Sequence, residues 1–159
     1  MIKTKLLKQI VASLSESLAL LEKAARASHA EATHESSKAE NKYDTRGLEA
    51  AYLAGGQARQ ARELMDSIML YESLPIREFS FADPIDVTAL VELECNGSKS
   101  TYFIGPSNGG LEVQFQGEEV TVITPQSPLG QNLLGKKSGQ LWTTKLAGSN
   151  AKYRITSVR

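Results

Sequence analysis

Apolar and small side chains recur through the first 70 residues with alternating steps of four and three, and this repeat constrains the fold most. One run comprises Leu7, Val11, Leu14, Leu18, Leu21, Ala25, Ser28 and Ala32, and a second comprises Ala51, Ala54, Ala58, Ala61, Met65 and Ile68. Such spacing is typical of heptad seams between packed helices. Pro75 ends the second run, since proline breaks the helical hydrogen bonding. We therefore predict an antiparallel coiled-coil hairpin over residues 1–75, with its turn between Glu35 and Asp44.

The two seams change character along their length. Both carry Leu, Val, Ile or Met near the ends of the hairpin that lie close to residues 7 and 70, and Ala or Ser towards the turn. Small residues bury little apolar area, and Gly55 and Gly56 each cost about 1 kcal/mol inside a helix. Two interpretations remain open: the far half tolerates alanine for its helix propensity, or it forms a finger that must be narrow.

After Pro75 the period changes to two. The segment DVTALVELEC alternates apolar residues on one face, and Asn96-Gly97 predicts a two-residue hairpin turn. Further strands are predicted in STYFIG, LEVQF, EVTVIT, QLWTTKL and AKYRITSV. One short helix is expected in SPLGQNLLG, with Ser127 as N-cap, Pro128 in the first turn and Gly135 as its stop. The predicted class is α+β, with an antiparallel sheet domain and one short helix over residues 79–159.

Composition limits the functional classes. The 159 residues carry 18 basic and 18 acidic side chains, so no overall field attracts nucleic acid. The single cysteine, Cys95, forbids an internal disulfide and fits a reducing compartment. Residues 2–21 contain four charged side chains and predict neither a membrane span nor a signal peptide. We expect a cytoplasmic protein with no membrane partner.

The sequence contains no complete catalytic motif. The segment GQNLLGK, residues 130–136, has the spacing of a phosphate-binding P-loop, but Lys137 stands where Ser or Thr should hold magnesium. A strand-like segment follows where a long helix should begin, so we reject a P-loop. His29 and His34 are five residues apart and share no helical face as a metal pair would.

The predicted turn and its flanks, residues 31–49, remain as a candidate site. This stretch carries Glu31, Glu35, Glu40, Asp44 and Glu49 against Lys38, Lys42 and Arg46. Charged turns are often only solvated, and Ser37 with Glu40, or Asn41 with Asp44, resembles an N-terminal capping box for the second helix. The residues alone do not distinguish these roles from a functional one.

The C-terminal segment VTVITPQSPLGQNLLGKKSGQ, followed by YRITSV, resembles the C-terminal domain of the bacterial Gre transcript-cleavage factors. The matching residues are Ser127, Pro128, Leu129, Leu133, Leu134, Gly135, Lys136 and Gly139, and the layout agrees over almost the whole chain. The resemblance implies an FKBP-like fold for residues 79–159 and bacterial RNA polymerase as partner. It implies that Ser127, Pro128 and Leu129, expected on an exposed surface, bind the rim of the polymerase's secondary channel.

The same resemblance assigns a role to the turn. In that family the hairpin enters the channel and its carboxylates help to hold a catalytic Mg²⁺ of the polymerase, so that backtracked RNA is cut near its 3′ end. Carboxylates suit Mg²⁺, which prefers hard oxygen ligands. The family pattern is Asp-x-x-Glu-Asn, but Ser37 stands here at the Asp position before Glu40 and Asn41. We therefore assign the catalytic and metal-assisting role to Glu40 and Asp44, with no intrinsic cofactor and no enzymatic activity of the chain alone.

Three alternatives stay open. A Gre-like chain could occupy the channel without stimulating cleavage, which needs shape but not both acids. An FKBP-like sheet domain could serve a peptidyl-prolyl isomerase or chaperone, although Phe103, Phe115, Trp142 and Tyr153 are scattered in a way that suits a core. A plain coiled-coil adaptor would bind no polymerase.

Overall fold

The computed structural model describes residues 2–33, 46–146 and 148–159. The chain divides into two compact units. One comprises Val11–Leu70, and the other comprises Met1–Ile10 together with Tyr71–Arg159. Each unit is described by itself below. None of the described helices is both long enough and apolar enough to cross a membrane.

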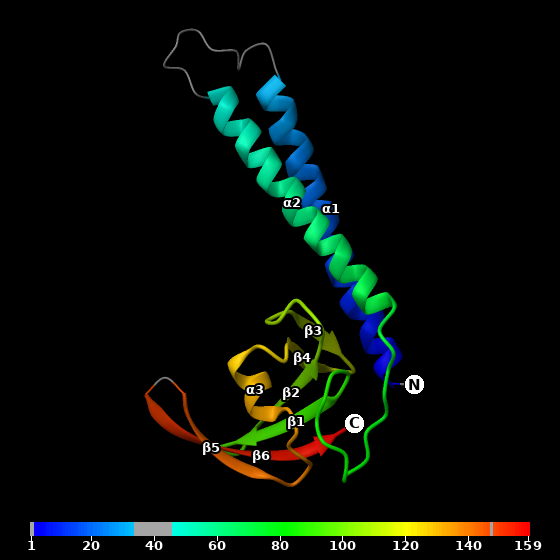
Figure 1. Cartoon of the computed structure of the whole chain (residues 1–159), viewed down its shortest axis with the longest axis vertical. Helices are drawn as coiled ribbons and strands as arrows, with labels where there is room; N and C mark the ends of the chain where they lie inside the picture. The colour runs from blue at the N-terminus through cyan, green and yellow to red at the C-terminus, as the bar shows by residue number, and fades with distance from the viewer. Residues whose placement is uncertain (1, 34–45, 147) are drawn as a thin grey trace. The chain divides into compact units, whose positions relative to one another are not determined.

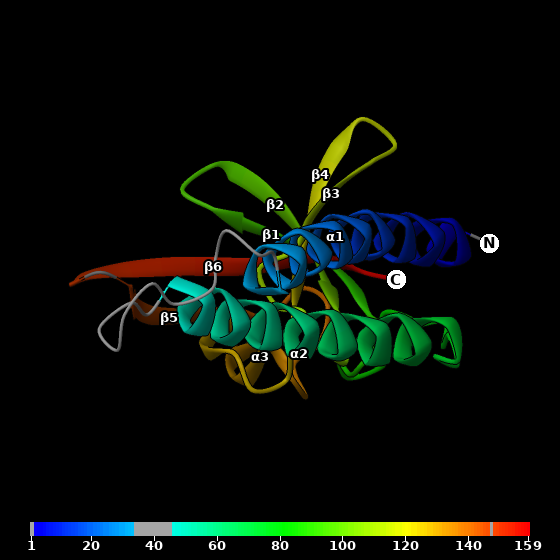
Figure 2. The same ribbon diagram turned by 90° about the horizontal axis from the view of Figure 1, so that it is seen from above.

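Two helices make up the first unit. Helices α1 (Ile2–Thr33) and α2 (Arg46–Glu72) lie side by side and run in opposite directions, as Figures 1 and 2 show. The Ser28 hydroxyl of α1 donates a 3.0 Å hydrogen bond to the side-chain oxygen of Gln57 in α2. The helical pair expected from the heptad pattern is thus confirmed. Its turn falls in residues 34–45, outside the described residues.

The predicted seam of α1 faces inward, whereas that of α2 is partly wrong. Every described member of the first seam, residues 7–28, is buried or half-buried. In α2, Ala61 is buried but Met65 is 46% exposed. The inward stripe runs instead through Leu64 and Ser67, because a pair of helices buries only a narrow strip of each and small rotations change which residues lie on it.

The second unit is built around a six-stranded sheet in the order β3-β4-β2-β1-β6-β5. The strands are β1 (Leu90–Cys95), β2 (Ser98–Ile104), β3 (Glu112–Phe115), β4 (Glu118–Ile123), β5 (Leu141–Leu146) and β6 (Ser149–Val158), and α3 spans Pro128–Leu133. The predicted α+β class, with a helical pair before a sheet domain carrying one short helix, is confirmed.

The sheet is mixed, whereas an antiparallel sheet was predicted. Strands β2 and β4 run parallel, with Thr101 opposite Val120 and Ile104 opposite Ile123. The reason is topological: β3 and β4 form a hairpin, and β4 inserts between β3 and β2, so it takes the direction of β2. Local patterns predict strands, but they do not show which edge a hairpin joins.

The predicted turn at Asn96-Gly97 is confirmed. Asn96 and Gly97 have φ angles of 51° and 79°, and a type I′ turn between β1 and β2 requires positive φ at both of these positions. A second tight turn joins β3 to β4 through Gln116 and Gly117, whose φ angles are 55° and 85°. The sequence carries no Asn-Gly or Asp-Gly signal at this second turn.

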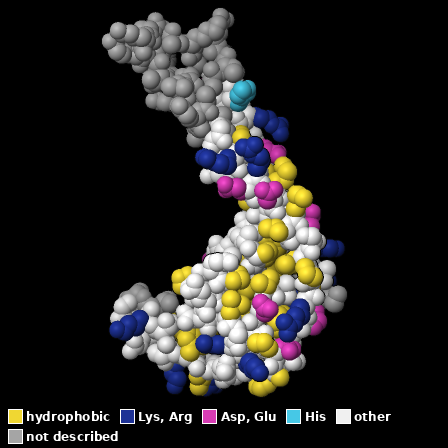
Figure 3. Space-filling model, in the orientation of Figure 1, with side chains coloured by type: hydrophobic (Ala, Val, Ile, Leu, Met, Phe, Trp, Pro, Cys, Tyr) yellow, Lys and Arg dark blue, Asp and Glu magenta, His cyan; other side chains and the backbone are white. Residues whose placement is uncertain are grey.

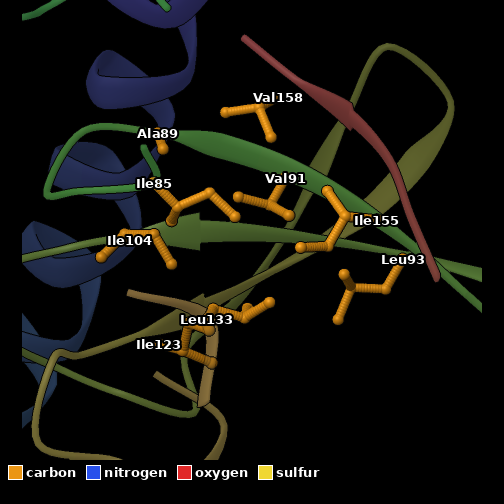
Figure 4. Close-up of a cluster of buried hydrophobic side chains, with 9 residues drawn as sticks. All are labelled: Ile85, Ala89, Val91, Leu93, Ile104, Ile123, Leu133, Ile155 and Val158. Carbon is orange, nitrogen blue, oxygen red and sulfur yellow. The ribbon is translucent and has the colours of Figure 1, made fainter. Parts of the chain in front are cut away.

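Apolar side chains are buried on both faces of the sheet. One face and α3 enclose a core cluster, drawn in Figure 4, of Ile85, Ala89, Val91, Leu93, Ile104, Ile123, Leu133, Ile155 and Val158. The alternate strand positions Leu90, Phe103, Val120 and Val122 are also buried. The same unit contains Leu6 and Ile10 of α1, both with no exposed surface, and Tyr71 at the end of α2.

A buried lysine anchors the segment that leads into the sheet. Lys3 is only 3% exposed, and its ammonium group donates a hydrogen bond to the backbone carbonyl of Arg77. The ammonium also lies 3.8 Å from the Glu78 carboxylate and 4.9 Å from the centroid of the Phe79 ring. Burial lowers the pKa of Lys3, partly offset by the neighbouring Glu78 charge. A buried charge is tolerated here because it has both a carbonyl and an aromatic face as partners.

Candidate functional site

Ser127 begins α3 with a side-chain cap. Its hydroxyl accepts a 3.0 Å hydrogen bond from the Gly130 amide and donates a 2.8 Å bond to the Thr124 carbonyl. The residue has φ −65° and ψ 152°, an extended conformation typical of an N-cap. Pro128 follows in the first turn, where its missing amide hydrogen costs nothing. The predicted start of this helix is confirmed.

Gly130 allows the first turn of α3 to approach the end of β4. A Cβ atom at this position would overlap the Thr124 carbonyl oxygen and lie 2.9 Å from the Ser127 hydroxyl oxygen. No side-chain rotation can relieve an overlap between a Cβ and a backbone atom. The glycine is therefore required for the turn in which the cap forms. From the sequence, Gly130 stands out only as part of the rejected P-loop spacing, and this role has no local sequence signal.

The far end of α3 is fixed to the loop before β1. Leu134 caps the helix by donating its amide to the Gly130 carbonyl, at 2.9 Å. Gly135, with φ 80°, then donates to the Ile85 carbonyl at 2.9 Å, and the Ile85 amide donates to the Lys136 carbonyl at 2.8 Å. The predicted stop at Gly135 is confirmed. Because the glycines lie within and after a six-residue helix, the rejection of a P-loop also stands.

The three predicted partner-binding residues differ in exposure. Pro128 is exposed, whereas Ser127 and Leu129 are half-buried, and Leu129 packs against the core cluster. Leu129 is thus less exposed than expected, since it packs towards the core, and the role of the three residues in partner binding stays a prediction. Pro128 and the exposed Gln131 form the accessible part of this turn.

An aromatic and cationic cluster follows the end of α3. The Trp142 and Tyr153 rings stack with centroids 5.0 Å apart, and the Lys136 ammonium lies 5.8 Å from the Trp142 ring centroid. The Trp142 Nε1 atom is buried and has no hydrogen-bond partner among the described residues. Burial raises the pKa of Tyr153, with a smaller contribution from Cys95. Trp142, expected in the core, packs on the core cluster as a partly buried residue.

Glu40 and Asp44 lie in residues 34–45, outside the described residues, so their predicted role stays a prediction. Within the described ranges no group of three or more His, Cys, Asp or Glu side chains is placed to hold a metal ion. Over the face drawn in Figure 3, basic and acidic side chains are interspersed, in keeping with a formal net charge of zero.

Comparison with protein families gives one match. The family described as "Transcription elongation factor, GreA/GreB, C-term" matches residues 82–159, which contain the whole sheet and α3. The chain belongs to the GreA/GreB family. It is a transcription elongation factor of that family, whose members act on RNA polymerase. The resemblance read from Ser127-Pro128-Leu129 and the residues after it is confirmed. A comparison with curated proteins gives no match.

Solved structures similar to this GreA/GreB-family chain have low identity. Gfh1, a GreA factor homologue of Thermus thermophilus, is 20% identical with a TM-score of 0.38, over 98% of this chain and 93% of that chain. Gfh1 of Thermus aquaticus is 22% identical with a TM-score of 0.41, over 99% and 94%. A GreA/GreB elongation factor of Nitrosomonas europaea is 20% identical with a TM-score of 0.33, over 60% and 78%. These scores support no conclusion about activity.

Proposed function

We propose that this Gre-family factor binds bacterial RNA polymerase through its sheet domain and places its helical pair in the secondary channel. There it acts on backtracked or paused complexes by assisting the polymerase's own Mg²⁺-dependent RNA cleavage. The observation that supports the proposal is the family match over residues 82–159, which includes the capped turn at Ser127. The chain alone carries out no chemistry in this proposal.

The turn that opens α3 is the proposed contact with the channel rim. Four hydrogen bonds at Ser127 hold it. Its hydroxyl donates to the Thr124 carbonyl and accepts from the Gly130 amide, its amide donates to the Thr124 carbonyl at 3.1 Å, and its carbonyl accepts from the Gln131 amide at 2.9 Å. Pro128 projects from this turn and is exposed. A contact that is ordered before binding loses little conformational entropy when the complex forms. Pro128 would make the direct contact, and Ser127 and Leu129 would position it.

Glu40 and Asp44 are the proposed metal-assisting residues. Their carboxylates are hard oxygen donors, which suit Mg²⁺, and one or two such groups suffice for an ion that keeps several waters. A second metal ion, when bound at the polymerase centre, activates water and stabilises the leaving oxygen of a phosphodiester. The two carboxylates would help to retain that ion.

Ser37 at the position of the family's first acid limits the expected potency. Phosphoryl chemistry depends chiefly on positioning, and a misplaced group of this kind can cost roughly 10²-fold in rate. We therefore propose channel occupancy with weak or conditional assistance to cleavage. Ser37 also favours the alternative, in which the chain occupies the channel without stimulating RNA cleavage.

RNA cleavage in a stalled, backtracked polymerase complex tests the proposal directly. The parent chain should accelerate cleavage, and the double variant Glu40→Ala/Asp44→Ala should abolish the acceleration while polymerase binding stays nearly unchanged. The variant Glu63→Ala/Asp66→Ala is the matched control, since it removes two carboxylates from the middle of α2. No acceleration by the parent despite binding would support the occupancy alternative. Cleavage that survives the first double variant would place the chemistry elsewhere.

The rim contact needs a probe that leaves the core intact. Pro128→Glu places a charge on the exposed residue of the turn, whereas a charge at Leu129 would also disturb the core cluster. Affinity for polymerase should fall at least about tenfold, the usual scale for a central interface residue. Gln114→Glu, on an exposed position of β3, is the control with the same added charge. Equal affinity of both variants would remove this turn from the interface.

A further inference from the structure

The two β-hairpins of the sheet diverge from each other. Strand β1 pairs with β2 over its whole length, and β3 pairs with β4 in the same way. Between the hairpins, however, β2 and β4 pair only from the rung Thr101↔Val120 onward. Before that rung, Ser98–Ser100 and Glu118–Glu119 pair with none of the described strands on the side where they face each other. Figure 2 shows the two hairpins splayed apart, with the β1–β2 turn and the β3–β4 turn pointing in different directions.

The space between the hairpins is an open cleft of about 540 Å³. Both of its walls are strands with unpaired backbone edges. Unpaired edges are templates for the backbone of another extended chain. Six side chains define its chemistry: Glu92, Lys99, Thr101, Glu112, Glu118 and Glu119.

The lining of the cleft is acidic. Its one basic residue, Lys99, is already engaged, because its ammonium lies 3.0 Å from the Glu92 carboxylate. The Thr156 hydroxyl donates a 2.5 Å hydrogen bond to the same carboxylate. By contrast, Glu112, Glu118 and Glu119 form no ion pair with the residues that the structure describes. Glu112 and Glu119 therefore remain available to a cationic ligand, and Glu118, whose charge also acts on Lys99, adds a third carboxylate.

A buried threonine lies where the hairpins part. Thr101 is only 7% exposed, and it lines this cleft and a smaller neighbouring cavity of about 120 Å³. It stands opposite Val120 on the first rung that joins β2 to β4, so it marks the base of the cleft.

We propose that this cleft binds an extended, Lys- or Arg-containing peptide segment of a partner protein. The peptide backbone pairs with an open edge of β2 or β4, and its basic side chains contact Glu112, Glu118 and Glu119. A strand places alternate side chains on opposite sides, so basic residues two apart reach the same wall. A nucleic acid is disfavoured, since its phosphates would face carboxylates. The site goes beyond the proposed contact at Pro128 and does not depend on the proposed function.

Binding of a defined peptide to the full chain tests this inference. The probe is the peptide acetyl-Thr-Arg-Val-Lys-Val-Arg-Thr-amide. Its binding is monitored through the backbone amide NMR shifts of the isotope-labelled protein at low salt. We expect saturable shifts centred on residues 98–101 and 118–121. The same peptide with Glu in place of Arg and Lys should bind at least about tenfold more weakly, and so should a version with Pro in place of Val, which cannot extend a strand.

Charge reversal on the wall supplies the matched protein variants. The variant Glu118→Lys/Glu119→Lys changes two exposed residues and should lower the affinity for the basic peptide at least about tenfold. The control variant Glu63→Lys/Asp66→Lys on α2 makes the same change in net charge and should keep that affinity within about twofold of the parent's. Equal binding of the acidic peptide, unchanged affinity of the Glu118/Glu119 variant, or shifts centred on α3 would each overturn the proposal. Concentration-dependent shifts at the same amides without peptide would also overturn it, since they would show that a second copy fills the cleft.

Discussion

The hydroxyl of Tyr71 donates a 2.6 Å hydrogen bond to the backbone carbonyl of Ser107. Tyr71 is 1% exposed and lies in the last turn of α2, whereas Ser107 lies in the loop between β2 and β3. Gly105 makes the approach possible, because a Cβ there would overlap the Tyr71 hydroxyl and lie 2.9 Å from Val122. The bond joins the end of α2 to the loop after β2 within one compact unit.

Removing this hydroxyl should destabilise that unit modestly. Tyr71→Phe keeps the ring in place but loses one hydrogen bond, which corresponds to about 1 kcal/mol of unfolding free energy. Urea denaturation followed by the fluorescence of Trp142, the single tryptophan, measures the change. Tyr102→Phe is the control. Tyr102 is half-buried, and the loss of its hydroxyl should change the free energy of unfolding by less than about 0.5 kcal/mol. Equal stabilities of the two variants would show that the bond contributes nothing.

Alkaline pH should weaken the same unit through Tyr71. Burial raises the pKa of Tyr71 to about 12 from a value of 10.0, although the bond to Ser107 acts in the opposite direction. Below pH 10 the folded and unfolded states both keep the proton. Between pH 10 and about 12 only the unfolded state releases it, so stability falls as pH rises, by roughly 2 kcal/mol. Tyr71→Phe should show a shallower loss over this range, and an identical pH profile would contradict the assignment.

A methyl group at Gly130 should be strongly destabilising. Gly130→Ala forces a Cβ against the Thr124 carbonyl, so either the first turn of α3 or the end of β4 must move. We expect a loss of at least about 2 kcal/mol, more than the alanine gains in helix propensity. Thermal unfolding followed at Trp142 should show a clearly lower midpoint. A variant as stable as the parent would mean that the cap at Ser127 forms without this close approach.

The opposite result is expected for the two glycines of α2. A Cβ at Gly55 or Gly56 would meet no described atom within 4 Å, and both residues are helical. Gly55→Ala and Gly56→Ala should each stabilise the helix by about 1 kcal/mol. Circular dichroism at 222 nm during thermal unfolding measures this change. Destabilisation by either alanine would favour the interpretation that the helical pair must stay narrow at this level.

Local signals in the sequence determined most individual elements. The heptad positions from Leu7 to Ser28 predicted α1 and its inward face, Asn96-Gly97 predicted the first hairpin, and Ser127-Pro128 with Gly135 predicted both ends of α3. Each of these signals acts through bonds or contacts that span only a few residues, such as a cap, a positive φ or the helical period. The family resemblance also rests on such a contiguous segment.

Relations between distant residues were decided only by the tertiary structure. The sequence did not show that β4 would run parallel to β2, that Lys3 would be buried against Arg77 and Phe79, or that Gly130 would lie against Thr124. Nor did it show the cleft that opens where the two hairpins part. Segment order along a sheet, and the burial of a given side chain, depend on packing among residues many positions apart. These packing interactions form only in the folded chain, so a short segment of sequence cannot predict them.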